Sequence, residues 1–319
     1  MNTGVKITAF AAALAATFGA AYGVGKGVGP VDEPAKAGHG EHAATAQPEG
    51  AGGHAGHAEG AATAPAAGGL QVSEGGYTLA METPRPTAGK GVLKFSIKDA
   101  GGRKVTAYTT EHGKELHFIV ASRDLTVYRH LHPVRAADGT WSTPVDLPAA
   151  GGYKAFADFK PAGKNAKGVT LGVDLSVPGA YAPQPLPAAA PTATVDGYQV
   201  ALGGTLDPGR AGELKLTVSK GGRPVTDLEP YLGAYGHLVA LRDGDLAYLH
   251  VHPNEGGPGP GVSFTATAPS AGTYRLFLDF QHGGKVRTAA FTVHAGAGHA
   301  TAPAPTGGAT HDAGGHAHG

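Results

Sequence analysis

Residues 117–133, "HFIVASRDLTVYRHLHP", and residues 237–253, "HLVALRDGDLAYLHVHP", share one pattern. In each stretch a histidine is followed by twelve residues and then by His-x-His-Pro, and the second stretch starts 120 residues after the first. Two stretches with three histidines at one spacing indicate that the residues between the histidines fold in the same way.

Further matches flank the two histidine stretches in the same order, which indicates an internal duplication. "LKFSIKDAGGRKVT" (93–106) corresponds to "LKLTVSKGGRPVT" (214–226), and "AAGGYKAFADF" (149–159) corresponds to "SAGTYRLFLDF" (270–280). We therefore place one domain at residues 70–178 and its copy at residues 195–294. Residues 179–194, rich in Pro and Ala, form the expected extended linker.

Each copy has the pattern of β-structure. Short alternating runs such as "LHFIV" (116–120) and "VTLGVDLSV" (169–177) are bounded by Gly, Pro and Asp, and no window has a helical period. We expect an all-β protein with two tandem β-sandwich domains, either immunoglobulin-like or cupredoxin-like. Tyr153 and Tyr274, each in a Gly-x-Tyr context, resemble the tyrosine corner of such sandwiches.

The twelve-residue gap predicts a hairpin that brings the histidines together. Asp243-Gly244 suits a two-residue type I′ turn, because both turn residues of that type need a positive φ. This turn would place His237 opposite His250, and the same turn at Arg123-Asp124 would place His117 opposite His130. His132 and His252 follow two residues later, so they would project from the same faces.

Three imidazoles on one patch suit Zn²⁺ or Cu²⁺, so the sequence predicts two metal sites. The alternative is that these histidines are buried polar residues bonded to the backbone, because apolar residues share their face. Asp158 and Asp279 occupy matching positions and are candidate fourth ligands, acceptors that orient a histidine, or loop caps. The predicted ligands are His117, His130 and His132 in the first copy and His237, His250 and His252 in the second.

Composition excludes several classes of protein. The 319 residues contain 25 Lys plus Arg and 25 Asp plus Glu, so no basic surplus indicates nucleic-acid binding. There is no cysteine, which excludes disulfides, thiolate zinc sites and blue-copper ligation. Only two residues are methionine, whereas 17 are histidine, so imidazole is the metal ligand that the chain supplies in quantity.

Both ends differ from the repeats. Residues 1–25 have one early cation, Lys6, before an uncharged run, which indicates a signal peptide or a membrane anchor and an extracytoplasmic location. Residues 26–69 and 295–319 consist mainly of small and polar residues and histidine, so we expect disordered tails that bind metal weakly. The tail histidines are His39, His42, His54, His57, His299, His311, His316 and His318.

The chain resembles a group of actinobacterial exported proteins described as secreted or heavy-metal-binding. "ELHFIVASRDLTVYRHLHP" (115–133), "GGYKAFADF" (151–159) and "YRLFLDFQHGGKVRTAAFTV" (274–293) carry the resemblance, together with "DLEPYLGAYGHLVALRDGDLAYLHVHP" (227–253). It extends over residues 70–294 and to "FGAAYGVGKGVGPVD" (18–32) near the start. The resemblance implies an exported, metal-associated protein whose ligands are the six histidines of the repeats.

The function predicted from the sequence is extracytoplasmic binding and handling of copper or zinc. Copper is preferred because the affinity of nitrogen sites peaks at Cu²⁺. The alternative is a structural or adhesive cell-envelope protein with tandem immunoglobulin-like domains and no specific metal site. We do not expect an enzyme, because no general base accompanies the histidines. The expected partners are metal ions, with membrane contact through residues 1–25 and no nucleic acid.

Overall fold

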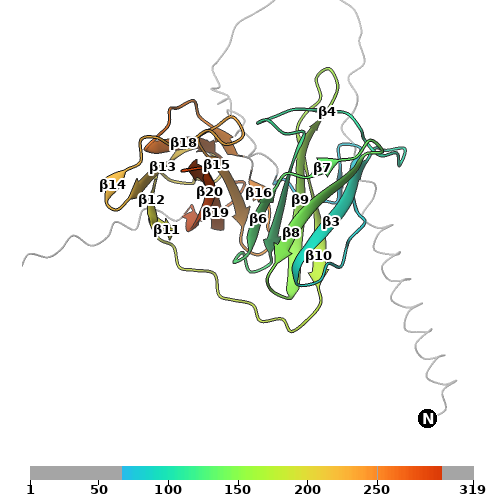
Figure 1. Ribbon diagram of the computed structural model, residues 1–319, viewed down its shortest axis with the longest axis horizontal. Helices are drawn as coiled ribbons and strands as arrows, with labels where there is room; N and C mark the ends of the chain where they lie inside the picture. The colour runs from blue at the N-terminus through green and yellow to red at the C-terminus, as the bar shows by residue number, and fades with distance from the viewer. Residues whose placement is uncertain (1–66, 250, 297–319) are drawn as a thin grey trace, which may run out of the picture. The chain divides into compact units, whose positions relative to one another are not determined.

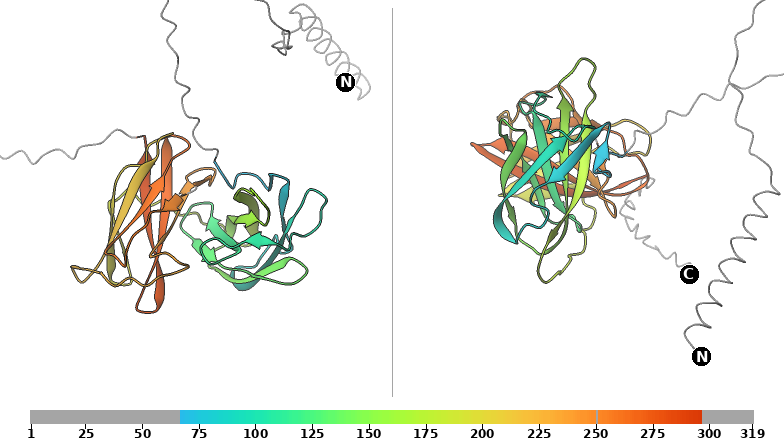
Figure 2. Two further views of the ribbon diagram at one scale, coloured as in Figure 1. Left: turned by 90° about the horizontal axis from the view of Figure 1, so that it is seen from above. Right: turned by 90° about the vertical axis from the view of Figure 1, so that its right-hand side faces the viewer.

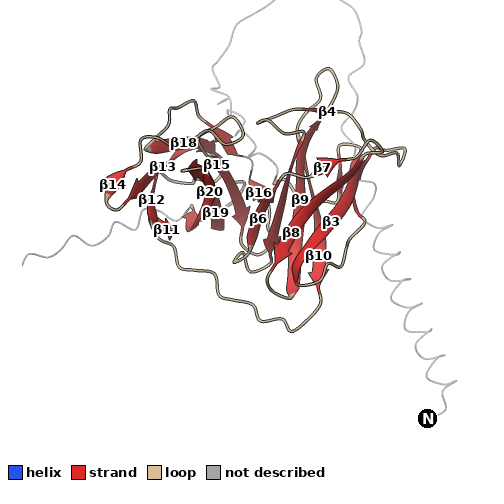
Figure 3. Ribbon diagram, in the orientation of Figure 1, coloured by secondary structure: helices blue, strands red, loops and turns tan. Residues whose placement is uncertain are grey.

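A computed structural model describes residues 67–249 and 251–296 (Figure 1). Within the second range the backbone of His252 is described but its side chain is not. These residues contain strands, turns and loops and no helix (Figure 3), so none of them forms a helix that could span a membrane. The predictions of an all-β protein and of two repeated domains are confirmed. The predicted signal or anchor, residues 1–25, lies outside the described residues, as do most of both tails.

The first repeat is a sandwich of two antiparallel sheets. One sheet has the order β1-β2-β3-β8-β7 and the other the order β10-β9-β5-β6, with β4 paired to β9. The first sheet consists of β1 (Ser73–Glu74), β2 (Tyr77–Met81), β3 (Gly89–Lys98), β8 (Thr140–Leu147) and β7 (Val134–Arg135). The second consists of β10 (Val169–Val177), β9 (Gly151–Pro161), β5 (Leu116–Ser122), β6 (Tyr128–Leu131) and β4 (Tyr108–Thr109).

The second repeat has the same arrangement, and its strands lie in two layers in Figure 2. The orders are β11-β12-β13-β18-β17, with β14 paired to β13, and β16-β15-β19-β20. The first sheet consists of β11 (Thr192–Val195), β12 (Tyr198–Gly203), β13 (Gly212–Lys220), β18 (Gly261–Ala266), β17 (Val251–Pro253) and β14 (Arg223–Pro224). The second consists of β16 (Tyr248–Leu249), β15 (His237–Arg242), β19 (Gly272–His282) and β20 (Lys285–Ala295).

This connectivity is that of the immunoglobulin sandwich. In chain order the strands of the first repeat correspond to A (β2), B (β3), C (β5), C′ (β6), D (β7), E (β8), F (β9) and G (β10). They form the A-B-E-D and G-F-C-C′ sheets of that fold. Of the two topologies that the sequence left open, the immunoglobulin-like one is present in both repeats.

Each repeat has a core between its two sheets, because alternate side chains of each strand point inward. In β3 the buried apolar residues are Leu93, Phe95 and Ile97, and the ring of Phe95 stacks on Phe118 of the opposite sheet at 4.2 Å. The tyrosine corners are present as expected. The Tyr153 hydroxyl donates to the carbonyl oxygen of Ala149 at 2.8 Å, and the Tyr274 hydroxyl to that of Ser270 at 2.9 Å.

A third apolar core lies between the G-F-C-C′ sheets of the two repeats. The ring of Tyr128 stacks on Phe277 at 4.0 Å, and the ring of Tyr248 lies 5.6 Å from Phe156. Tyr128 corresponds to Tyr248 and Phe156 to Phe277, so each repeat gives the tyrosine of one contact and the phenylalanine of the other. Both repeats therefore pack through the same face. The buried members of this core are Ile119, Ala121, Leu125, Tyr128 and Phe156 with Val239, Leu241, Leu246, Tyr248 and Phe277.

The predicted two-residue hairpin turns are wrong. In the first repeat Ile119 pairs with His130, and Ser122 bonds to Val127, so the loop has four residues and the register differs by two. In the second repeat Leu241 pairs with Tyr248, which is the same difference, and Asp243 lacks the positive φ of a type I′ turn. A shift of two residues, unlike a shift of one, keeps every side chain on its expected face.

Two features favour the longer loop. Asp124 accepts hydrogen bonds from the Ser122 hydroxyl and the Thr126 amide, which closes the loop around its carboxylate. Leu125 has a φ of 56° and Leu246 a φ of 59°, and both side chains are fully buried in the third core. Their burial offsets the strain of a left-handed backbone at a residue other than glycine.

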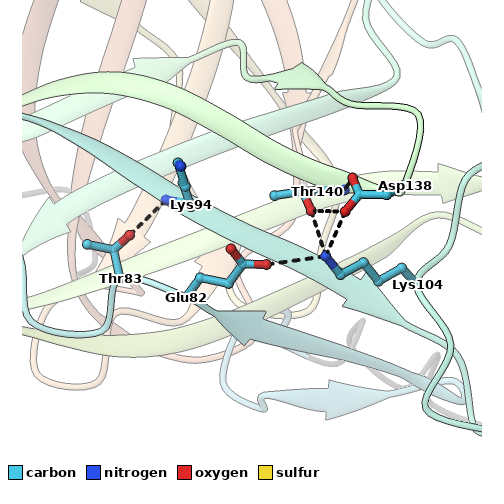
Figure 4. A network of polar contacts seen from close by, with 6 residues as sticks. All are labelled: Glu82, Thr83, Lys94, Lys104, Asp138 and Thr140. Carbon is cyan, nitrogen blue, oxygen red and sulfur yellow. Dashed lines mark hydrogen bonds and ion pairs between the residues drawn. The ribbon is translucent and has the colours of Figure 1, made fainter.

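Outside the sheets, polar contacts hold the loops. The Lys104 ammonium donates to Thr140 at 2.6 Å and lies 3.2 Å from Asp138 and 3.3 Å from Glu82 (Figure 4). Thr83 accepts a bond from the Lys94 amide nearby. This network ties the loop after β3 to the turn before β8, and because it is exposed it contributes little stability.

The chain is already bonded to both repeats before β1. The Gly69 amide donates to the Thr170 carbonyl at 2.9 Å, and Gly68 exchanges two backbone bonds with Tyr248. Residues 67–69, predicted to belong to the N-terminal tail, therefore link the two repeats through backbone hydrogen bonds. We call this segment the strap.

We expect Gly172→Ala to release this strap. A Cβ at residue 172 would lie 1.9 Å from the carbonyl oxygen of Gly69, so one of the two segments must move. The expected loss is about 1–3 kcal/mol of unfolding free energy, measured by urea denaturation. Gly91→Ala is the matched control, because a Cβ there meets no atom within 4 Å. Equal stability of the two variants would contradict a role for the strap.

Candidate metal centre

Three histidines of the first repeat form a cluster on the face that packs against the second repeat. His117 lies on β5, His130 lies on β6, and His132 follows the end of β6. One ring nitrogen from each can be chosen so that all three lie within 4.8 Å of one another. The ring centroids are 5.3 Å apart for His117 and His130, 5.4 Å for His117 and His132, and 4.8 Å for His130 and His132.

The alternation of the strands explains this position. Phe118 and Val120 point into the core of the first repeat, whereas Ile119 points into the third core, between the repeats. His117 shares the face of Ile119, and His130 pairs with Ile119 across the hairpin, so both imidazoles lie on that face. The cluster therefore lies at one end of the apolar contact between the repeats.

In two of these rings one nitrogen contacts an acceptor group outside the cluster. We call this nitrogen the outer one and the other nitrogen of the ring the inner one. Nδ1 of His130 lies 2.8 Å from Oδ2 of Asp279, and Nε2 of His117 lies 3.4 Å from the Glu111 carbonyl oxygen. Because a carboxylate and a carbonyl can only accept, they place the protons on these outer nitrogens. With these tautomers the inner nitrogens, Nδ1 of His117 and Nε2 of His130, face each other with lone pairs; they lie 3.1 Å apart, a distance at which either nitrogen, when protonated, donates a hydrogen bond to the other.

The third ring has a free inner nitrogen as well. Nδ1 of His132 lies 3.4 Å from the Tyr231 hydroxyl. Nε2 of His132 is buried and has no hydrogen-bond partner among the described residues. A buried nitrogen without a partner is costly unless something absent from the structure binds it.

Asp279 is positioned to orient a ligand. It belongs to the second repeat, yet its carboxylate and the His130 side chain are 4% and 6% exposed and in direct contact. Its other oxygen accepts a bond from Thr288. This is the position of an outer acceptor that sets the tautomer of a metal ligand, one of the roles considered from the sequence.

Asp158, the equivalent residue of the first repeat, lies opposite His117 in the β5–β9 pairing. Its Oδ1 accepts a bond from Thr170 at 2.9 Å. Asp158 also lines a cavity of about 360 Å³ that borders the cluster, together with His117, His130, His112 and His237.

The second predicted cluster lies only partly within the described residues. His237 lies on β15, and its Nε2 lies 2.7 Å from the Tyr231 carbonyl oxygen. His250 lies outside the described residues. The backbone of His252 is in β17 and pairs with Thr265 of β18, in the other sheet of the sandwich, and its side chain is not described. The predicted pairing of His237 with His250 therefore stays a prediction. The described pairs of this hairpin, such as Leu241 with Tyr248, follow a register that differs from the predicted one by two residues.

Burial keeps the imidazoles of His117, His132 and His237 neutral. Desolvation, with a smaller effect of the neighbouring His130, lowers the pKa of His117 to about 3 and that of His132 to about 3. Desolvation also lowers the pKa of His237. Neutral imidazole is the form that binds metal, so at neutral pH no proton has to leave these rings first.

The turns that carry the outer acceptors are not among the features predicted from the sequence. His112-Gly113 and Leu232-Gly233 have positive φ at both residues, as type I′ turns require, and they hold Glu111 and Tyr231 beside the histidines. The available signal was the x-Gly pair five or four residues before the first histidine of each stretch. Tyr231 itself carries no sequence signal for contact with His132, because the two residues lie in different repeats.

Comparison with known proteins shows the family. Residues 71–174 and 193–297 each match a family described as a domain of unknown function (DUF8832). The chain belongs to this family and carries two copies of its domain. No curated protein sequence matches the chain.

Several solved structures of all-β proteins are similar to the chain at low identity. InvD of Yersinia pseudotuberculosis is 14% identical, with a TM-score of 0.22, over 73% of this chain and 62% of that one. Domains 5–6 of the S-layer protein SbsC are 15% identical, with a TM-score of 0.20, over 68% and 96%. A marsupial T cell receptor is 10% identical, with a TM-score of 0.22, over 68% and 62%. At these values the three structures say nothing about what this chain binds.

The lowered pKa values predict acid sensitivity of the metal-free protein. Above about pH 6.5, the ordinary pKa of histidine, His117 and His132 are neutral both folded and unfolded. As the pH falls from 6.5 toward 3 the unfolded chain takes up protons that the folded chain does not. Stability should therefore fall by up to about 1.4 kcal/mol per pH unit for each histidine.

Urea denaturation with a chelator present, followed by the fluorescence of Trp141, measures this slope between pH 7.5 and 5. His132→Leu should reduce the slope, whereas the exposed His294→Ala should leave it unchanged. Tail histidines that bind the same number of protons in the folded and unfolded chain do not contribute to the slope. A slope that is the same in wild type and His132→Leu would show that His132 is not held neutral.

Proposed function

We propose that this protein binds a divalent transition metal, copper or zinc, through His117, His130 and His132. The observation that carries the proposal is the pair of inner nitrogens 3.1 Å apart, Nδ1 of His117 and Nε2 of His130, on rings whose outer nitrogens are bound by Glu111 and Asp279. Two nitrogens bound at about 2.0–2.1 Å to one tetrahedral ion are about 3.3 Å apart.

The donor set supports copper or zinc over other metals. The ligands are three imidazoles with a carboxylate only in an outer position, which disfavours the oxygen-seeking ions Ca²⁺ and Mg²⁺. Among nitrogen sites the affinity peaks at Cu²⁺, so copper is the preferred ion where both are present. The second-repeat ligands His250 and His252 and the weak tail sites remain part of the proposal as the sequence predicts them.

We place this activity outside the cytoplasm, as binding and handling of metal rather than turnover. The early cation and uncharged run of residues 1–25 support the location. Two of the three acidic side chains of the cavity wall form ion pairs with cations: Glu111 with Lys160 at 3.2 Å and Glu115 with Arg135 at 3.0 Å. Paired carboxylates are poor general bases, which supports a binding role over an enzyme.

A second candidate function is that of a structural or adhesive protein of the cell envelope. The observation in its favour is a pair of exposed apolar side chains on the A-B-E-D sheet of the first repeat. Val92 on β3 is 52% exposed, and Val134 on β7 is 73% exposed. Such side chains suit contact with another protein, and this function would not require the histidine cluster.

Zinc should stabilise the first repeat through the cluster. At a hundredfold excess over Kd the expected gain is about 2.7 kcal/mol, seen as a higher melting temperature by Trp141 fluorescence. Trp141 is the single tryptophan and is buried in the core of the first repeat, so metal bound only by the tails does not move this signal. His130→Ala/His132→Ala should lose the gain, and His294→Ala should keep it. An equal gain in all three proteins would favour the structural function.

Asp279→Asn tests the outer acceptor. The amide keeps the shape but removes the charge that favours a proton on Nδ1 of His130. The expected result is a 10–100-fold weaker zinc affinity, measured by competition with a chromophoric chelator. Asn254→Asp, an exposed site on the loop after β17, controls for a change of one charge in the same repeat. Unchanged affinity in Asp279→Asn would remove Asp279 from the site.

A further inference from the structure

The second repeat places a histidine beside the cluster of the first. The ring centroid of His237 lies 6.3 Å from that of His117 and 6.2 Å from that of His130. His237 is the counterpart of His117 in the duplicated sequence, and its strand, β15, is the counterpart of β5. The contact between the repeats thus brings two equivalent C-strand histidines together.

The two rings are bound in the same way. Nε2 of His237 lies 2.7 Å from the Tyr231 carbonyl oxygen, as Nε2 of His117 lies 3.4 Å from that of Glu111. Glu111 and Tyr231 occupy equivalent places, at the start of two type I′ turns. Because a carbonyl only accepts, Nε2 of His237 carries the proton and Nδ1 is left as a free lone pair.

Three histidines leave one position of a tetrahedral ion unfilled. Four imidazoles around one such ion have ring centroids roughly 5 Å apart, which the three rings of the cluster already approach. The centroid of the His237 ring is about 1 Å farther from those of His117 and His130 than this geometry requires. The cavity of about 360 Å³ is lined by His237, His117 and His130, so the imidazole has space to close this gap by side-chain rotation.

We infer that His237 is the fourth ligand, so that one metal ion is held by three histidines of the first repeat and one of the second. This inference rests on the proposed function and deepens it. A site filled by four protein nitrogens is closed, as structural and storage sites are, and leaves no position for a substrate. The bound ion would also join the two repeats, in addition to the apolar contact between them.

Co²⁺ added to the full-length protein tests the coordination. Tetrahedral Co²⁺ absorbs several-fold more strongly in the visible range than five- or six-coordinate Co²⁺. The spectrum of His117→Ala/His130→Ala/His132→Ala serves as the background from the tails and is subtracted. Wild type should show the intense tetrahedral bands. His237→Ala should show weaker, shifted bands and about 100-fold lower affinity for Co²⁺, because losing a direct ligand lowers the affinity at least as much as losing a residue that only hydrogen-bonds to a ligand.

Two control variants sharpen the test. His294→Ala, an exposed histidine on β20, should behave as wild type. His112→Ala removes the other ring beside His237, whose centroid is 5.7 Å away, and should leave the bands unchanged. If His112→Ala alters the bands and His237→Ala does not, the fourth ligand is His112 and the inference is overturned. If neither alters them, solvent fills the fourth position and the inference is also overturned.

Hydrogen exchange on the same full-length proteins separates this inference from the proposed function. Zinc should slow exchange in residues 231–238 of wild type, because His237 is held, and this protection should be lost in His237→Ala while that of β5 remains. Protection of β5 alone in wild type would overturn the fourth ligand and leave the three-histidine site intact. No zinc-dependent protection of either strand would overturn the proposed function itself.

Discussion

The structure depends on the burial of two equivalent sheet faces against each other. Each G-F-C-C′ sheet carries apolar side chains on the side away from its own core, such as Ile119 and Phe156 in one repeat and Val239 and Phe277 in the other. Apolar surface removed from water contributes about 25 cal/mol per Å², so each copy covers what the other would leave exposed. The leucines of the hairpin loops, Leu125 and Leu246, enter this contact even at the cost of a left-handed backbone.

This contact also buries polar groups, and their pairing follows from the same geometry. A carboxylate taken out of water is costly unless hydrogen bonds replace its hydration. Asp279 meets this requirement through Thr288 of its own sheet and His130 of the other repeat. His117 and His132 respond to burial by staying neutral, which prepares them for a metal ion. The first repeat alone brings His117, His130 and His132 together, and docking adds the contact of His130 with Asp279.

The two copies of the family domain differ at the strand that follows the hairpin. In the first repeat β6 stays in the C-strand sheet through Leu131, so His130 keeps its place beside His117. In the second repeat β16 ends at Leu249 and β17 has joined the other sheet by Val251. His237 is thereby left on β15 facing the cluster of the first repeat. Duplication supplied the same residues twice, and a local change of strand gave them different surroundings.

The sequence by itself determined the duplication, the β class and the face on which the first-repeat histidines lie. Periodicity of two sets the face, and the error of two residues in the loop length left it unchanged, which is why His117, His130 and His132 meet despite a wrong turn at Arg123-Asp124. Tertiary structure alone decided the topology, the contacts of His130 with Asp279 and of His132 with Tyr231, and the approach of His237. The physical reason is that these contacts join residues about 100 to 150 positions apart in different repeats. Local propensity and spacing act within a strand or a hairpin, whereas the docking of two sandwiches follows from the shape and polarity of whole sheet faces.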